Sequence, residues 1–220
     1  MILEKVVTQA SNLLKRKNID THQLDAEVIL SDIMGVNREF LILNSQLIIN
    51  KKTLKKYNFA IERRVKREPV AYIVGKKEFW SENFLVNKNT LVPRPETELM
   101  IYKVLKFFKN RKINILDVGT GSGCLLLSIL KNLKFSRGIG IDISSKAIEV
   151  ASTNAKNLNL SNRVHFKISD ITNYNIGKYD LIISNPPYIP SKDIKNLSKD
   201  ITNHEPKSAL DGGIDGLDLI

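Results

Sequence analysis

The feature that most constrains the fold is an alternation of short apolar runs and helical segments between Ile113 and Ser184. Apolar runs bounded by glycine and separated by helices are typical of a parallel sheet that is covered on both faces. The pattern predicts, in order, strand Ile113–Val118, helix Cys124–Leu133, strand Gly138–Ile143, helix Ser145–Asn157, strand Arg163–Ser169 and strand Tyr179–Ser184. We therefore expect an α/β domain with a Rossmann-like, mainly parallel sheet.

The N-terminal third of the chain carries a helical pattern instead, with apolar residues that recur every three or four positions. Such spacing places the apolar side chains on one face of a helix. It predicts helices that contain Val6–Leu14 and Leu24–Met34, lie near Arg38–Leu43 and run from about Thr53 to Arg67. We therefore expect residues 1–74 to form a small helical domain.

A short hairpin is expected between these two regions. Two runs, Glu78–Trp80 and Phe84–Val86, flank Ser81–Asn83, a pattern typical of a β-hairpin. Trp80 is then a packing residue at a domain junction. We expect residues 75–92 to be this hairpin linker and residues 93–220 to form the α/β domain.

The α/β domain begins with two prolines, Pro93 and Pro95, on either side of Arg94. Two prolines this close favour an extended backbone. The acidic residues that follow Pro95 suit the first turn of a helix, which we expect to run to about Lys109.

A glycine-rich turn, Asp117–Gly123, stands where the first predicted strand of the sheet passes into a helix. Glycine lets the backbone turn sharply and approach a ligand closely, and the amide groups at the start of a helix attract anionic groups. Asp142 ends the next strand, where its carboxylate is suited to accept both hydroxyls of a ribose. The alternative interpretation is a structural turn with a solvated Asp142.

The details of this turn favour S-adenosylmethionine over NAD. The turn reads Gly-x-Gly-x-Gly rather than Gly-x-Gly-x-x-Gly, and Asp117 lies two residues before the first glycine. A pyrophosphate requires an uncluttered helix N-terminus, whereas S-adenosylmethionine has none, is cationic and tolerates a nearby aspartate. Asp170 follows the third strand, where the adenine edge would lie, and Ile171 is suited to cover the adenine face. An ordinary loop residue is the alternative for Asp170.

A second pattern, Asn185-Pro186-Pro187-Tyr188, follows the last predicted strand. Adjacent prolines force the chain to leave the sheet there. The Asn185 side-chain oxygen and the Pro186 carbonyl can then accept from one NH2 group, while Tyr188 covers its flat face. An amide nitrogen is a poor nucleophile, so such a loop would act by positioning and electrostatics, with Asn185, Pro186 and Tyr188 as catalytic residues. A proline-rich exit loop without chemistry is the alternative.

Four segments together resemble the peptide chain release factor glutamine N5-methyltransferases, the PrmC/HemK family: Leu91–Glu98, Asp117–Gly123, Asn185–Ile189 and His204–Leu217. The resemblance implies that S-adenosylmethionine contacts Gly119, Thr120, Gly121, Ser122, Gly123, Asp142, Asp170 or Ile171, and Asn185. It implies that the substrate glutamine is held by Asn185, Pro186, Pro187 and Tyr188, with Arg94 and Glu98 lining the site. That glutamine would belong to the Gly-Gly-Gln motif of a class I release factor, which the helical domain contacts.

The same resemblance implies an incomplete C-terminal end, because the family fold continues with a helix, another parallel strand and an antiparallel hairpin. We therefore expect an exposed sheet edge and low stability. Two other functions stay open. One is an adenine amino-methyltransferase acting on nucleic acid, which shares the Asn-Pro-Pro-Tyr loop. The other is a fragment that binds the cofactor or the release factor without turnover.

The formal net charge of +11 raises a nucleic-acid hypothesis. Lysines outnumber arginines and are spread along the chain, in runs such as Lys51-Lys52 and Lys55-Lys56, which favours solvated faces over a dedicated surface. We expect no direct nucleic-acid binding, while an anionic macromolecular partner stays open.

Metal binding and membrane insertion are not expected. Cys124 is the single cysteine, and neither His22 nor His165 has a companion at metal-ligand spacing. No apolar run approaches the roughly 20 residues that span a bilayer, and the N-terminus lacks the order of a signal peptide. We expect a cytoplasmic monomer.

Overall fold

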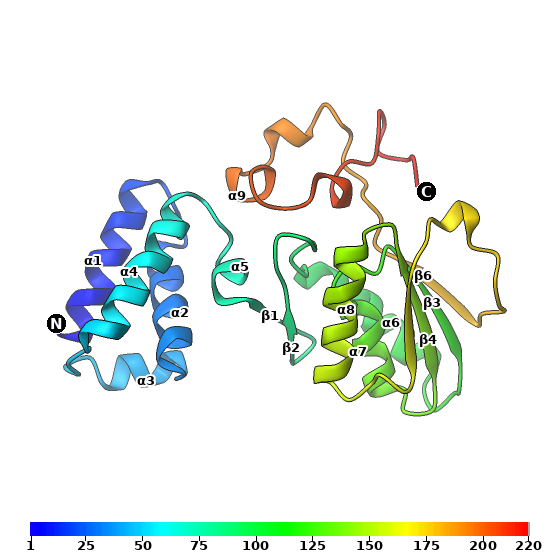
Figure 1. The fold of residues 1–220 in the computed structure, drawn as a ribbon, viewed down its shortest axis with the longest axis horizontal. Coiled ribbons are helices and arrows are strands. Elements are labelled where there is room, and N and C mark those ends of the chain that lie inside the picture. The colour runs from blue at the N-terminus through cyan, green and yellow to red at the C-terminus, as the bar shows by residue number, and fades with distance from the viewer. Residues whose placement is uncertain (220) are drawn as a thin grey trace. The chain divides into compact units, whose positions relative to one another are not determined.

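The computed structural model describes residues 1–219, and the chain divides into two units (Figure 1). Residues 1–74 and 199–204 form a helical unit, while residues 75–198 and those from 205 onward form a unit that contains the sheets. Each unit has its own apolar core. Nothing in the sequence pattern indicates that residues 199–204 join the helical unit.

The helical unit contains α1 (Leu3–Arg16), α2 (His22–Met34), α3 (Arg38–Leu43), α4 (Lys51–Val65), α5 (Val70–Val74) and α9 (Lys199–Thr202). Asparagine side chains cap the N-termini of α3 and α4. Asn37 accepts a hydrogen bond from Phe40 N and Asn50 accepts one from Thr53 N, both at 2.9 Å. The apolar stripes of α1, α2 and α4 meet in the core. Tyr57 is buried there, and its hydroxyl donates to Ala26 O at 3.0 Å.

A buried charge ties α9 into the helical unit. The Arg64 side chain is 5% exposed, and its guanidinium lies 2.6 Å from Asp25 Oδ2 and 2.8 Å from Asp200 Oδ2. It also donates to Glu68 O at 3.2 Å. A buried guanidinium is costly unless its donors are satisfied, so Asp25 and Asp200 both stabilise the position of Arg64.

The second unit begins with an antiparallel hairpin, β1 (Lys76–Phe79) and β2 (Glu82–Leu85). Its turn is the two-residue Trp80-Ser81, not the three residues 81–83 expected from the sequence. Both turn residues have positive φ, 51° and 61°, which matches the twist of a two-residue hairpin although neither is glycine. The Trp80 amide donates to Glu98 Oε1 at 2.8 Å, which holds the turn to the start of α6 (Glu98–Phe107).

The main sheet has four parallel strands in the order β5 (Val164–Ile168), β4 (Arg137–Asp142), β3 (Asn114–Val118) and β6 (Leu181–Ser184). Helix α7 (Cys124–Asn132) follows β3, and helix α8 (Ser145–Asn157) follows β4. Val118 pairs with both Ile141 and Ser184, so the carboxyl ends of β3, β4 and β6 meet at one edge.

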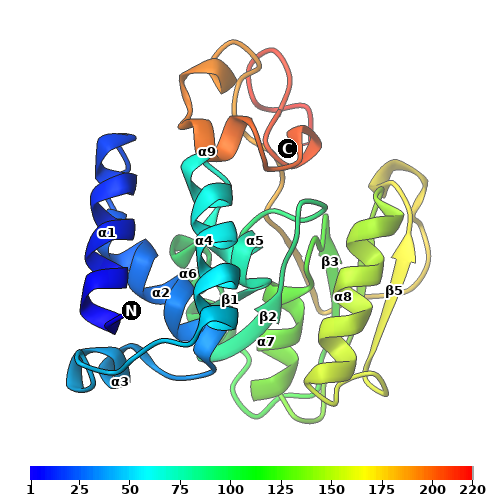
Figure 2. The ribbon, with the colours of Figure 1, turned by 60° about the vertical axis from the view of Figure 1, so that its left-hand side comes forward.

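The helices of this unit cover one face of the sheet, which corrects the expectation of cover on both faces. Figure 1 shows α6, α7 and α8 on the same side of the strands, and Figure 2 shows α8 running alongside β5. On β6, Ile182 is 62% exposed. The physical reason lies in the connection between β5 and β6, where the only helical element of the described residues is the short 3-10 turn Ile171–Asn173.

No helix among the described residues combines the length and the apolar character needed to cross a membrane.

Candidate active site

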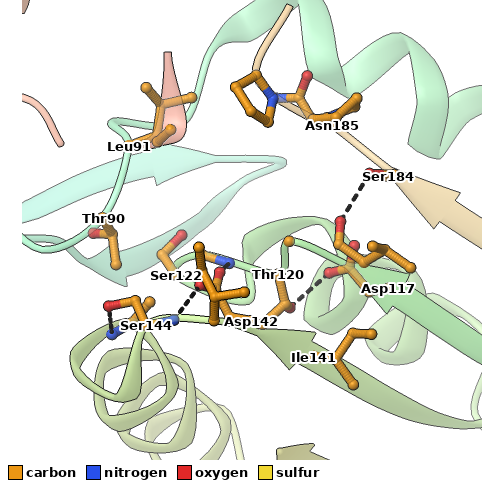
Figure 3. A pocket seen from close by; sticks show the side chains of 18 of the residues that line it. Thr90, Leu91, Asp117, Thr120, Ser122, Ile141, Asp142, Ser144, Ser184 and Asn185 are labelled. Atoms are coloured by element: carbon orange, nitrogen blue, oxygen red, sulfur yellow. Dashed lines mark hydrogen bonds between the residues drawn. The ribbon is translucent and has the colours of Figure 1, made fainter. Parts of the chain in front are cut away.

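A cavity of about 220 Å³ opens at the carboxyl edge of the main sheet. Its walls come from four loops that leave the ends of β3, β4, β5 and β6, from the extended segment that contains Leu91 and Arg94, and from a later segment that contains Pro206 and Ala209. Figure 3 shows Asp117, Asp142 and Asn185 around this cavity. Crevices at the carboxyl ends of parallel strands are where open α/β sheets bind their ligands.

The glycine-rich turn forms one wall of the cavity because its backbone has left-handed geometry. Gly119, Gly121 and Gly123 have φ of 69°, 56° and 77°, which side-chain-bearing residues rarely adopt. A Cβ at Gly123 would also lie 3.1 Å from Leu127 Cδ1 and 3.2 Å from Ala151 Cβ. Glycine at this position therefore serves both the turn and the packing of the helices behind it.

Asp142 is held at the end of β4 by two backbone amides. Its Oδ2 accepts from Gly121 N at 2.9 Å, and its Oδ1 accepts from Ser144 N at 2.9 Å. Each carboxylate oxygen has a further lone pair, so the group can still accept the two hydroxyls of a ribose. The fixed orientation makes Asp142 a preorganised acceptor.

Asp117 is a buried carboxyl group at the floor of the cavity. Burial raises its pKa to about 7, and the Asp142 charge adds to this rise, while the hydrogen bond from Thr120 Oγ1 at 2.7 Å opposes it. A cation bound nearby would stabilise the ionised carboxylate. Cys124 starts α7 beside it, and burial raises the pKa of this thiol to about 12, so it is not a nucleophile at neutral pH.

Asp170 and Ile171 both line the cavity. Asp170 Oδ1 accepts from the Thr172 amide and hydroxyl, each at 2.9 Å, and these bonds lower the pKa of the Asp170 carboxyl. Ile171 is more than one-third exposed, which leaves an apolar surface at the rim.

The loop after β6 brings Asn185, Pro186 and Pro187 to the cavity wall. Within the described part of the chain, the Asn185 side chain and the Pro186 carbonyl make no hydrogen bond. Both acceptors are therefore available to a ligand. Tyr188 is 61% exposed and is not part of the cavity wall.

A later segment of the chain supports this loop through its backbone. Ile189 N donates to Leu210 O at 3.1 Å, Gly212 N donates to Ile189 O at 2.9 Å and Ser191 N donates to Gly213 O at 2.8 Å. Proline has no backbone donor, so Pro186 and Pro187 cannot make such bonds. The segment from Leu210 to Gly213 supplies bonds immediately after them.

Side chains complete this support. Asp211 Oδ1 accepts from Ser191 Oγ at 2.6 Å and from Gly213 N at 3.1 Å, and the Ser191 bond is the main reason that the pKa of Asp211 is lowered. A Cβ at Gly212 would lie 2.7 Å from the Pro187 carbonyl oxygen. Sequence reasoning assigned no role to Asp211 or Gly212, although the paired glycines at 212 and 213 were a signal of close approach.

Arg94 lines the cavity, and a buried carboxylate orients it. Glu205, whose side chain is 2% exposed, lies 2.6 Å from the Arg94 guanidinium and accepts from Val92 N at 3.2 Å. Sequence reasoning included Glu205 in the segment His204–Leu217 but gave it no role in the site. Glu98 was expected beside Arg94, but it lies outside the cavity wall and holds the hairpin turn at Trp80.

The lining suits S-adenosylmethionine in its chemistry. Asp142 offers acceptors for ribose hydroxyls, the buried Asp117 favours a cation, and the glycine turn lets a ligand approach the backbone. No cluster of His, Cys, Asp or Glu suited to a metal is found among the described residues. Fold, turn and cavity together define a Rossmann-like, S-adenosylmethionine-dependent methyltransferase.

Comparisons with known proteins agree with this class. Residues 109–208 match the family described as methyltransferase domain, and residues 5–75 match the PrmC N-terminal domain. Among solved structures, the hMettl16 catalytic domain in complex with MAT2A 3'UTR hairpin 6 is 15% identical with a TM-score of 0.50, covering 77% of this chain and 60% of that one. At that identity the likeness concerns the fold alone.

Relatives that match nearly all of this chain identify the family within the methyltransferases. The release factor glutamine methyltransferase of Caulobacter vibrioides is 41% identical over 99% of this chain and 76% of its own length. That of Clostridium acetobutylicum is 38% identical over 100% of this chain and 78% of its own length. The chain belongs to the release factor glutamine methyltransferase family. This confirms the predicted resemblance and the predicted α/β class.

Proposed function

We propose that this chain transfers a methyl group from S-adenosylmethionine to the side-chain amide nitrogen of a glutamine in class I peptide chain release factors, in their Gly-Gly-Gln motif. One observation carries the proposal: two acceptors, on Asn185 and Pro186, have no hydrogen-bond partner among residues 1–219, and they lie at the wall of the cavity that the glycine-rich turn and Asp142 also line. Family membership supports the choice of substrate.

S-adenosylmethionine would be bound by groups that the fold already holds in place. Asp142 would accept the ribose hydroxyls, and the backbone of residues 119–123 would lie against the ligand. Asp170 and Ile171 would border the adenine, and Asp117 would lie near positive charge. S-adenosylmethionine supplies an electrophilic methyl group on a sulfonium.

The loop would act on the glutamine by positioning it. The Asn185 oxygen and the Pro186 carbonyl would accept one N–H each, which orients the amide nitrogen and favours its pyramidal form. The methyl–sulfur bond would break as the new N–C bond forms, with its electron pair left on sulfur, and one N–H proton would be released to solvent while the other would remain on the product amide. Tyr188 and Pro187 would border the amide plane, and Arg94, oriented by Glu205, would line the approach.

The finer assignments follow from the same proposal. Release factors are the partner, and the helical unit is the part of the chain that would recognise them. We expect the chain to act as a monomer in the cytoplasm. Size-exclusion chromatography with light scattering would detect a dimer and contradict the monomer.

The substrate can be tested with S-adenosylmethionine labelled at the methyl group. Purified chain should label a class I release factor, and it should not label the same factor after its Gly-Gly-Gln glutamine is changed to Glu. Label that appears only in added RNA or DNA would contradict the proposal and favour an adenine amino-methyltransferase. Cofactor binding without label in either would favour a non-catalytic role.

Asn185→Ala tests the loop. We expect the variant to lose at least about 100-fold in kcat, because it removes one of the two acceptors that position the nitrogen. Its Kd for S-adenosylmethionine should stay within about tenfold of the wild type, since positioning is lost more than affinity. Asn196→Ala, an exposed site further along the same connection, is the matched control. Equal kcat in both variants would mean that Asn185 holds no reacting group.

A further inference from the structure

The amino edge of the main sheet, opposite the cavity, is strongly basic. The loops that lead into its strands span residues 108–113, 133–136, 158–163 and 174–180. With the first residue of β4 they carry seven cationic side chains: Lys109, Arg111, Lys112, Lys134, Arg137, Arg163 and Lys178. They carry one carboxylate, Asp180. Seven of the chain's 34 Lys and Arg residues are therefore gathered at one edge of this unit, against a single carboxylate.

A hollow of about 440 Å³ lies within this edge. Its lining consists of four cationic residues (Lys112, Lys134, Arg137 and Arg163) with Asn110, Asn162 and Phe135, and it contains no acidic residue. A second hollow of about 250 Å³ shares Arg137, Asn162 and Arg163 with the first and continues to Lys178 and Tyr179. The two form one basic groove, which we define by these lining residues.

The charges in the groove are not neutralised by the protein. Lys112, Lys134 and Arg137 are exposed and make no ion pair within the described residues. Asp180 is not among the residues that line the groove; its Oδ2 accepts from Asn114 N at 2.8 Å, and it makes no ion pair with another described residue. Arg163 stabilises the end of α7, because its guanidinium donates to Leu130 O at 2.8 Å and to other backbone carbonyls there.

An aromatic ring stands among these cations. Phe135 lies between Lys134 and Ser136 in the loop after α7 and is 77% exposed. Exposed aromatic rings that border a positively charged groove are how proteins bind single strands, because bases stack on the ring while phosphates contact the cations. The side-chain amides of Asn110 and Asn162 add donors and acceptors in the same groove.

We propose that this groove binds single-stranded nucleic acid, with phosphates at Lys112, Lys134 and Arg137 and a base stacked on Phe135. The binding is separate from methyl transfer, because the groove and the cavity lie at opposite ends of the same strands. The proposal does not rest on the proposed function. It revises the sequence-based expectation that direct nucleic-acid binding is absent.

The test uses the full chain and fluorescein-labelled twelve-nucleotide oligo-U and oligo-dT in anisotropy titrations at several salt concentrations. Lys134→Gln/Arg137→Gln should weaken binding about tenfold or more. It should also reduce the slope of log K against log salt by about 1.4, since each lost phosphate contact contributes about 0.7 for single strands. Lys51→Gln/Lys52→Gln, an exposed pair on α4 with the same change of charge, should have little effect.

Phe135→Leu separates stacking from charge. The substitution keeps an apolar side chain and the net charge, and we expect about fivefold weaker binding or more, because stacking on an aromatic ring contributes about 1 kcal/mol or more per base. Unchanged thermal unfolding and S-adenosylmethionine binding would show that each variant is folded. Equal weakening by the α4 pair, unchanged affinity in Phe135→Leu, or equally tight binding of poly-glutamate would each overturn the proposal.

Discussion

At the scale of single residues, burial sets the protonation of ionisable groups in the cavity. Asp117 shows this most clearly. It is a carboxyl group in the floor of a cavity, with Thr120 as its hydrogen-bond donor and the Asp142 charge nearby. Its raised pKa leaves it partly protonated near neutral pH until a cation binds.

Asp117 therefore predicts a pH dependence of stability. Its pKa rises from an ordinary 3.8 to about 7 on folding, so between these values the folded state binds more protons than the unfolded state. Stability from this group is present below about pH 4 and is lost as pH rises toward 7, by about 1.4 kcal/mol per pKa unit at most. Asp117→Asn, which still accepts from Thr120, should not show this loss.

Urea unfolding at pH 5 and at pH 8 would measure this prediction. The fall in the free energy of unfolding between the two pH values should be larger for the wild type than for Asp117→Asn. A difference of zero between the two proteins would mean that Asp117 is ionised in the folded cavity at both pH values.

At the scale of elements, two segments about 20 residues apart in the sequence are hydrogen-bonded together at the loop that we propose to be catalytic. The loop after β6 has consecutive prolines and few donors of its own, and the segment from Leu210 to Gly213 supplies the missing backbone bonds. We therefore expect Asp211 and Gly212 to act as positioning residues for Asn185 and Pro186, although neither lines the cavity.

Asp211→Ala tests this support. The variant loses the acceptor for Ser191 Oγ and Gly213 N, and we expect kcat on the release factor to fall about tenfold, as for other hydrogen bonds to charged groups. The KM for S-adenosylmethionine should change little. Asp211→Asn keeps one acceptor oxygen and should retain most of the rate, while Asp215→Ala in the same segment is the control. Equal rates for all three variants would contradict the positioning role.

At the scale of the whole molecule, the chain passes between the two units at three points: after residues 74, 198 and 204. Residues 199–204 belong to the helical unit, where Asp200 forms an ion pair with the buried Arg64. Five residues after Asp200, Glu205 is held in the other unit by Arg94 and Val92. Both ends of this passage are thus held by charged side chains.

Asp200→Ala should weaken the attachment of residues 199–204 to the helical unit. Arg64 retains Asp25 but loses its tie to α9, so residues 199–204 should exchange amide hydrogens faster, and trypsin should cut after Lys199 about tenfold faster. Glu27→Ala removes the exposed ion pair with Arg38 in the same unit and should leave cleavage unchanged. Equal cleavage of both variants and the wild type would mean that apolar contacts alone hold α9.

Much of the fold could be predicted because its signals are local. The strand and helix periods identified β3 to β6, α7 and α8 to within a few residues, and the spacing of Gly119, Gly121 and Gly123 identified a turn that needs positive φ. Glu98 illustrates the limit. Its place after Pro95 predicted a helix start correctly, but its carboxylate contacts Trp80, 18 residues earlier, rather than the cavity.

The sequence by itself determined the α/β class, the glycine-rich turn and the Asn-Pro-Pro-Tyr loop, because periodicity, positive φ and the missing donors of proline are properties of neighbouring residues. Only the tertiary structure decided the pairs Arg94–Glu205, Ser191–Asp211 and Arg64–Asp200, and the gathering of Lys112, Lys134 and Arg137 into one groove. The partners in each pair, and Lys112 and Lys134 in the groove, are at least 20 residues apart in the sequence, and folding brings them together through the burial of apolar surfaces that lie elsewhere.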